Sequence, residues 1–244
     1  MNPSPSRSLL ERPTLSAQVA RHLLSLVDRH QMRPGDAVPS EGQIGLELKV
    51  SRGSVREAYR TLAALGILEI EGGRKPRLRA LDASVLAQVF GYALDTEQVT
   101  VAHALETRRA LELQTAQLAA RHASEAQRQR LRELVAQMRS AGANHAQRVA
   151  ADMGIHTIIA EASGNPLTNL LLGALQAPRE ASSRMHLADT RTAAELTRVI
   201  DAHEHVVERI CAGDAVGAAS AMSYHFDLAM VHVQRQDGPV QVIT

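Results

Sequence analysis

The sequence predicts a mainly α-helical protein: an N-terminal winged helix-turn-helix, followed by an all-α antiparallel bundle of six or seven helices. Two observations lead to this prediction. Apolar residues recur at helical spacing along most of the chain, and a strand-like alternation occurs only in a short hairpin around Gly72-Gly73. Aromatic residues make up only 2% of the chain. The cores must therefore be Leu, Ala and Val packing between helices rather than aromatic-rich sheets.

Residues 12–80 have the pattern of a winged helix-turn-helix, with three helices and a two-stranded wing. A first helix is expected from about 16 to 30. Ser40 and Gln43 form a capping box that begins a second, short helix. We expect the apolar residues of this second helix to contact the core, namely Ile44, Leu46 and Leu48.

The third helix carries the chemistry of this first region. Ser51 can cap it, and Arg52 and Arg56 lie four residues apart on one face. Such a helix can enter the major groove, where Arg donates hydrogen bonds to guanine or phosphate and small hydroxyl residues reach phosphate or bases. The alternative is an ordinary amphipathic helix with a solvated basic face. The residues expected to contact DNA are Ser51, Arg52, Gly53, Ser54 and Arg56 of the helix, with Gly73 and Arg74 of the wing.

The charge distribution favours the DNA interpretation. Residues 1–80 hold 13 Lys and Arg against 8 Asp and Glu, whereas the remainder holds 14 against 18. A basic front and an acidic back indicate that only the front meets a polyanion. The single Cys211 excludes an internal disulfide, and no apolar run is long enough for a membrane span or a signal peptide. We therefore expect a cytoplasmic protein that does not contact a membrane.

The second region, residues 99–236, is expected to follow a linker at 81–98 and to be helical throughout. Thr100 can cap a long helix at its start. Further on, a short helix over 167–177 is expected to stop before Pro178.

Four polar residues of the second region can converge on one site. Asp152 and His156 are four residues apart and therefore share a helix face, while His203 and His225 lie on the last two predicted helices, which antiparallel packing would bring side by side. Three imidazoles and a carboxylate suit a divalent ion such as Zn²⁺ or Ni²⁺. On spacing alone, hydrogen-bonded core histidines are the favoured alternative.

The motifs of the first region resemble the signature of GntR-type bacterial transcriptional regulators. These motifs are Pro39-Ser40-Glu41, the run from Val50 to Ala58, and Leu65-Gly66. The resemblance implies that Arg52 and Arg56 contact DNA, together with the small residues beside them. Members of that family often carry Arg directly after the Pro-Ser-Glu, whereas this chain has Gly42. The resemblance therefore implies the fold but not the operator sequence.

Residues 100–232 resemble the FCD ligand-binding domain of the FadR-like branch of these regulators. The matching motifs are Glu106-x-Arg108-x-x-Leu111-Glu112, Asp152-x-x-x-His156, Ala162-Ser163-Gly164-Asn165, and His203 followed by Gly213-Asp214, Met222 and His225. The resemblance implies a divalent metal held by the Asp and three His. This chain differs from many members of that branch in having Ile155 where they have Phe.

The same resemblance implies that Arg108 helps to hold a small organic acid, with assistance from Asn165. For Arg108 the alternative is a salt bridge to Glu112 or to another helix, and for Asn165 it is helix capping. We expect a homodimeric regulator, acting as a repressor, that reads a pseudo-palindromic operator and responds to a small carboxylate.

Two other classes of protein compete with this interpretation. A metal-dependent hydrolase or isomerase could use the same Asp and His residues, but it would need a general base, and Glu161 is the one carboxylate nearby on that helix and lies off the ligand face. An architectural DNA-binding protein without an effector would leave the polar cluster unused.

Overall fold

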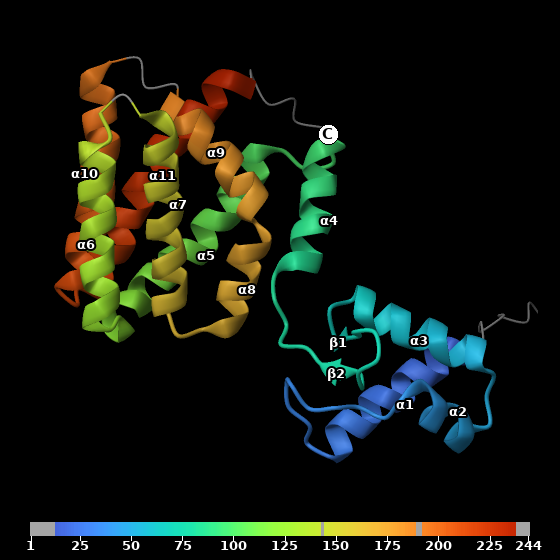
Figure 1. Cartoon of the computed structure of the whole chain (residues 1–244). Helices are drawn as coiled ribbons and strands as arrows, with labels where there is room; N and C mark the ends of the chain where they lie inside the picture. The colour runs from blue at the N-terminus through green and yellow to red at the C-terminus, as the bar shows by residue number, and fades with distance from the viewer. Residues whose placement is uncertain (1–12, 143, 189–191, 238–244) are drawn as a thin grey trace, which may run out of the picture. The chain divides into compact units, whose positions relative to one another are not determined.

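The computed structural model of the chain describes residues 13–142, 144–188 and 192–237. The chain divides into two compact units, with the boundary between Val85 and Leu86. Each unit is described by itself below, with the elements labelled as in Figure 1. Within the described residues, no helix has the length and apolar character needed to cross a membrane.

The first unit contains three helices and a small antiparallel sheet, as the sequence predicted. The elements are α1 (Leu15–Arg29), α2 (Glu41–Leu48), α3 (Arg52–Ala64), β1 (Leu68–Glu69) and β2 (Arg77–Leu78). Leu68 lies opposite Leu78 in the sheet. Arg77 also forms an isolated bridge with Ala37, so the wing is tied to the segment between α1 and α2. This arrangement confirms the winged helix-turn-helix.

Local sequence signals account for the helix boundaries of this unit. The Ser40 hydroxyl accepts a hydrogen bond from the Gln43 backbone while the Gln43 side chain accepts one from the Ser40 backbone, which confirms the capping box. Lys49 has a left-handed backbone conformation (φ 52°) and turns the chain into α3. The Ser51 hydroxyl then accepts from the Ser54 amide at 3.2 Å. These contacts stabilise the turn that positions α3.

One predicted core contact of α2 is wrong. Leu46 is 83% exposed, although Ile44, two residues earlier, is fully buried. Two residues correspond to about 200° around an α-helix, so the two side chains point to nearly opposite faces. The core therefore takes Ile44 from this short helix and leaves Leu46 in solvent.

The second unit consists of helices in its described part. They are α4 (Ser84–Asp95), α5 (Val101–His122), α6 (Glu125–Ser140), α7 (His145–Ala162), α8 (Pro166–Ala174), α9 (Gln176–Ala188), α10 (Ala193–Cys211) and α11 (Ala215–Asp237). Seven of these, α5 to α11, form the bundle expected from the sequence (Figure 1). The stretch predicted as a linker contains α4, of which no residue is buried.

The core of the bundle forms where α5 contacts α7, α10 and α11, with α6 closing against α7 and α10. Its largest fully buried apolar side chains are Leu105, Leu131, Met138, Ile155, Ile159, Ile210, Met222 and Phe226. Thr100 caps α5 as predicted, and capping boxes begin α5, α6 and α10 at Thr100, Ser124 and Thr192. This core surrounds the polar cluster described below.

The expected end of a helix at Pro178 is wrong. The helix that was expected to stop there ends at Ala174, and a new helix, α9, begins at Gln176 with Pro178 in its first turn. Proline is tolerated in the first turn because the backbone N–H groups there have no intrahelical acceptor to lose. Pro178 therefore marks the start of a helix, and α9 brings further side chains to the polar cluster.

The exposure difference within α2 can be tested by two truncations two residues apart. We expect Ile44→Ala to lower the free energy of unfolding by roughly 2–5 kcal/mol, because it leaves a cavity in the core. Leu46→Ala should change it by less than about 0.5 kcal/mol, because that side chain is in solvent. Urea denaturation of the full chain measures both values, and a large loss for Leu46→Ala would contradict the described packing.

Candidate functional site

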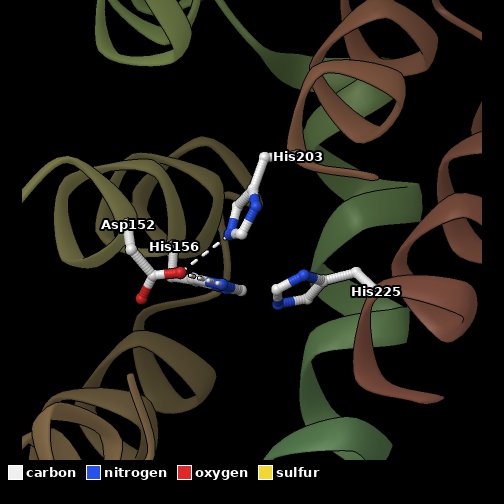
Figure 2. Close-up of side chains that lie close together, drawn as sticks. All are labelled: Asp152, His156, His203 and His225. Carbon is white, nitrogen blue, oxygen red and sulfur yellow. Dashed lines mark hydrogen bonds and ion pairs between the residues drawn. The ribbon is translucent and has the colours of Figure 1, made fainter. Parts of the chain in front are cut away.

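The four residues predicted to converge lie together inside the bundle. Asp152 and His156 come from α7, His203 from α10 and His225 from α11, and all four are buried. Each offers one ligand atom, and these atoms all lie within 4.8 Å of one another. Figure 2 shows the side chains directed toward one another from the three helices. The i, i+4 spacing on α7 and the packing of α10 against α11 together create this cluster.

The contacts within the cluster centre on one carboxylate oxygen. Asp152 Oδ1 lies 2.7 Å from His203 Nε2 and 3.8 Å from His156 Nε2. The ring centroids of His203 and His225 are 4.3 Å apart. The buried His156 Nε2 has no hydrogen-bond partner among the described residues. A polar atom of this kind costs free energy unless another group binds it.

Three of the four residues make a further hydrogen bond outside the cluster. In each case this bond leaves one ligand atom directed to the centre of the cluster. His156 Nδ1 is hydrogen-bonded to the carboxylate of Glu112, and His203 Nδ1 donates to the Val199 carbonyl at 2.8 Å. Asp152 Oδ2 accepts a hydrogen bond from the Ser183 hydroxyl. Such contacts orient histidine and carboxylate ligands in metal sites. The three histidines, the carboxylate and their supports fit a borderline divalent ion.

The buried carboxylates are ionised despite their surroundings. Burial by itself would raise the pKa of Asp152, but the hydrogen bond with His203 and the nearby His156 hold that pKa well below its usual range. Burial also opposes ionisation of Glu112, yet Arg108 and His156 lower its pKa to about 2. The site therefore contains two negative charges away from solvent.

Arg108 takes part in this network through a salt bridge. Its Nε donates to Glu112 Oε1 at 2.8 Å, which is one of the alternatives that the sequence left open. A second guanidinium nitrogen donates to the Ser182 hydroxyl at 3.0 Å. Glu112 thus binds Arg108 with one oxygen and His156 with the other. This carboxylate links the predicted effector residue to a predicted metal ligand.

A small cavity adjoins the cluster. It has a volume of about 10 Å³, and its lining includes Arg108, Asp152, His156, His225 and Phe226. That volume is comparable to the space that one water molecule requires. In this conformation the cavity can therefore hold an ion or a water molecule, but not an organic acid.

Asn165 lies away from this cavity lining, in the loop before α8. Its side-chain oxygen accepts hydrogen bonds from the backbone amides of Leu167 at 3.1 Å and Thr168 at 3.3 Å. These contacts make Asn165 the N-terminal cap of α8. The residue is also exposed at the surface. The structure thus supports the capping alternative that the sequence left open.

Several residues of the site were missed because they lie on α9. Ser182 and Ser183 contact Arg108 and Asp152, and Arg179 lies one turn earlier on the same helix. The spacing of these three residues, i, i+3 and i+4, is that of one helix face. Treating Pro178 as the start of a helix would have revealed that face.

The residues predicted to contact DNA belong to the first unit, at the start of α3 and in the wing. Arg52, Gly53 and Arg56 are exposed, whereas Val55 and Tyr59 turn inward to the core. Arg56 is 59% exposed, and its Nε lies 3.7 Å from a Glu41 carboxylate oxygen. A surface pair at this distance contributes little and leaves the guanidinium accessible to another anion.

The wing places its predicted residues at an exposed turn. Gly73 has φ +79°, a left-handed conformation that favours glycine. Arg74 next to it is exposed and donates to Glu71 at 2.6 Å. Ser51 and Ser54, in contrast, bond to each other at the start of α3. The wing and the α3 start thus present cationic groups beside small residues.

Models of two protein families match the chain. Residues 15–75 match the model described as bacterial regulatory proteins of the gntR family. Residues 103–228, more than half of the chain, match the model described as the FCD domain. The two matches fall in the first and second units respectively.

Similar proteins include transcriptional regulators. The HTH-type transcriptional regulator LutR of Bacillus subtilis is 29% identical over 205 residues, covering 82% of this chain and 92% of LutR. The HTH-type transcriptional repressor NanR of Cronobacter sakazakii is 30% identical over 164 residues, covering 66% of this chain and 63% of NanR.

Solved structures show the same fold. A GntR structure from Streptococcus agalactiae aligns with a TM-score of 0.66 at 25% identity, covering 88% of this chain and 99% of that one. Escherichia coli McbR/YncC aligns with a TM-score of 0.50 at 17% identity, covering 93% and 100%. The second likeness concerns the fold alone.

The low pKa of Glu112 predicts how the free energy of unfolding depends on pH. Because that pKa is about 2 in the folded chain against an ordinary 4.5, its stabilisation is fully present above pH 4.5 and is lost as the pH falls toward 2. In metal-free protein, Glu112→Gln should therefore reduce the loss of unfolding free energy between about pH 5 and pH 3. Denaturant titrations measure this difference, with Glu106→Gln, exposed on the same helix, as the control. An unchanged pH dependence in Glu112→Gln would contradict the buried ion pair.

Proposed function

Because the chain belongs to the gntR family of bacterial regulatory proteins and carries an FCD domain, we propose that it is a regulator that senses a small organic acid at a divalent metal site. Like the members of its family and the relatives named above, it is a transcriptional regulator and not an enzyme. The observation that carries the sensing proposal is the buried cluster of Asp152, His156, His203 and His225.

Asp152 and the three histidines would hold the ion, Zn²⁺ or Ni²⁺, through Asp152 Oδ1, the Nε2 atoms of His156 and His203, and the His225 ring. His156 Nε2 has no hydrogen-bond partner among the described residues, which supports this assignment, as does the contact of Glu112 with the same ring. When bound, such an ion supplies a Lewis acid that attracts a carboxylate. Asp152 and Glu112 offset part of its charge within the bundle.

Arg108 is the proposed partner of the acid in this chain. It lines the cavity, and one of its nitrogens donates to the neutral hydroxyl of Ser182, a contact that a carboxylate could replace. Asn165 would assist from the loop before α8, secondarily to its capping role. Since the cavity has a volume of about 10 Å³, its lining must open before an acid can bind. We expect α9 to move in this opening, because Ser182 and Ser183 bring it against Arg108 and Asp152.

The first unit is the proposed reader of operator DNA. Ser51, Arg52, Gly53, Ser54 and Arg56 would enter the major groove, since they are at the start of α3 and its cationic groups are exposed. Gly73 and Arg74 would contact the backbone or the minor groove. A homodimer would place two such helices on a pseudo-palindromic operator in the cytoplasm.

We expect the regulator to act as a repressor, in line with the relatives that are named transcriptional repressors. Binding of the acid would stabilise one arrangement of the bundle and change operator affinity through differential affinity for two conformations. The competing idea of a hydrolase or isomerase is disfavoured by the family. Glu161, its proposed base, is also exposed at the end of α7, whereas the cluster is buried.

The assignment of the DNA-reading helix can be tested with one arginine. Arg56→Ala should weaken operator binding by roughly 1–3 kcal/mol and relax sequence preference if Arg56 reads a base. Electrophoretic mobility shifts or fluorescence anisotropy with operator and scrambled duplexes measure both effects. Arg130→Ala, an exposed arginine of the second unit, is the control. Specific binding that persists unchanged in Arg56→Ala would remove α3 from the proposed interface.

The metal site can be tested with histidines that differ in burial. His156→Ala and His203→Ala should each lose stoichiometric metal and, with it, the response of DNA binding to organic acids, because each removes a ligand. His205→Ala is the matched control, since His205 is only two residues from His203 but is exposed. Metal content by inductively coupled plasma mass spectrometry gives the readout. Full metal occupancy in both ligand variants would rule out the site.

A further inference from the structure

Arg179 is a buried cation that the contacts described so far do not neutralise. Arg179 is only 6% exposed, and one of its guanidinium nitrogens donates to the Thr157 hydroxyl at 3.1 Å. Its Nε has no hydrogen-bond partner among the described residues, and none of their acidic side chains forms an ion pair with it. A guanidinium removed from water in this way is costly unless an anion joins it.

Arg179 lies on the same face of α9 as Ser182 and Ser183, which contact the acid and metal residues. The Ser182 hydroxyl donates to the Arg179 carbonyl at 2.8 Å and accepts from Arg108 at 3.0 Å. The Thr157 hydroxyl that accepts from the Arg179 guanidinium belongs to the residue directly after His156 on α7. The Arg179 side chain therefore lies beside the turn of α7 that carries a proposed metal ligand, and no role assigned above uses it.

The charges of this region point to the kind of anion that would join it. Arg108 and Arg179 carry two formal positive charges, and Glu112 and Asp152, which contact Arg108 and His203, carry two formal negative charges. A divalent ion held by neutral histidines would leave two positive charges uncompensated in the bundle. A dianion would balance them, whereas a monoanion would leave one charge buried without a counterion.

We propose that Arg179 is a second anion-binding residue and that the effector is a small dicarboxylate. One carboxylate would bind at the metal and Arg108, and the other would bind the Arg179 guanidinium through its Nε. This inference rests on the proposed function, because it extends the same acid site. It adds the class of ligand and the residue that selects it. Because Arg179 is on α9, the second carboxylate would also engage the helix that we expect to move when the acid enters.

Matched pairs of acids test this inference on the metal-loaded full chain. Malonate, succinate and glutarate are compared by isothermal titration calorimetry with propionate, butyrate and valerate, which have the same numbers of carbon atoms but one carboxylate. In the unmodified chain, at least one dicarboxylate should bind roughly 30-fold or more tightly than its partner, as expected for a buried charge pair. Metal content measured after each titration excludes removal of the ion by the acid.

Variants of two arginines on α9 assign the selectivity. Arg179→Gln should remove most of the preference for dicarboxylates while leaving monocarboxylate affinity and metal content nearly unchanged. Arg184→Gln makes the same charge change on the same helix at a residue whose side chain is 66% exposed, and it should retain the preference. Arg179→Lys retains the charge but not the planar fork, and we expect it to lose roughly tenfold of the preference.

The possible outcomes separate this inference from the proposed function. Equal binding of mono- and dicarboxylates by the unmodified chain, or equal losses for both in Arg179→Gln, would overturn the role of Arg179 while the acid site stands. If Arg179→Gln does not fold, Arg179→Lys decides, and an unchanged preference in that variant overturns the inference. If no acid binds although metal is present, the proposed sensing function fails, and the dicarboxylate inference fails with it.

Discussion

Burial of charge inside the helical bundle is the constraint on which the second unit depends. Glu112 joins Arg108 through one oxygen and His156 through the other, and Asp152 is held by His203 and Ser183. Each of these groups would be costly alone in an apolar interior, so they persist only as a connected network. Four of the helices therefore have to keep their positions for the network to form.

This network also leaves two buried nitrogens available to a ligand. His156 Nε2 and Arg179 Nε have no hydrogen-bond partner among the described residues, so a bound ion or anion would supply one. Because the adjoining cavity has a volume of about 10 Å³, the proposed binding of an acid would be linked to a change in helix packing, which is what the proposed sensor would require.

The first unit handles charge in the opposite way. Its core is apolar around Val55, Tyr59 and Leu62, and the arginines of α3 stay at the surface, where Arg56 has only a weak pair with Glu41 among the described residues. Exposed guanidinium groups remain available to the phosphates and bases of DNA. The first unit thus keeps arginines at its surface, whereas the second unit buries Arg108 and Arg179 in its interior.

Local signals in the sequence determined the helix starts, the wing, and the spacing of Asp152 with His156, because caps and periodicity act over three or four residues. They did not determine which face of a short helix enters the core, as Leu46 shows, or that Pro178 begins a helix. Only the tertiary structure decided that Glu112 supports His156 from 44 residues away and that α9 brings Ser182 and Ser183 to the site. Contacts between distant segments depend on how all the helices pack at once, which no local pattern encodes.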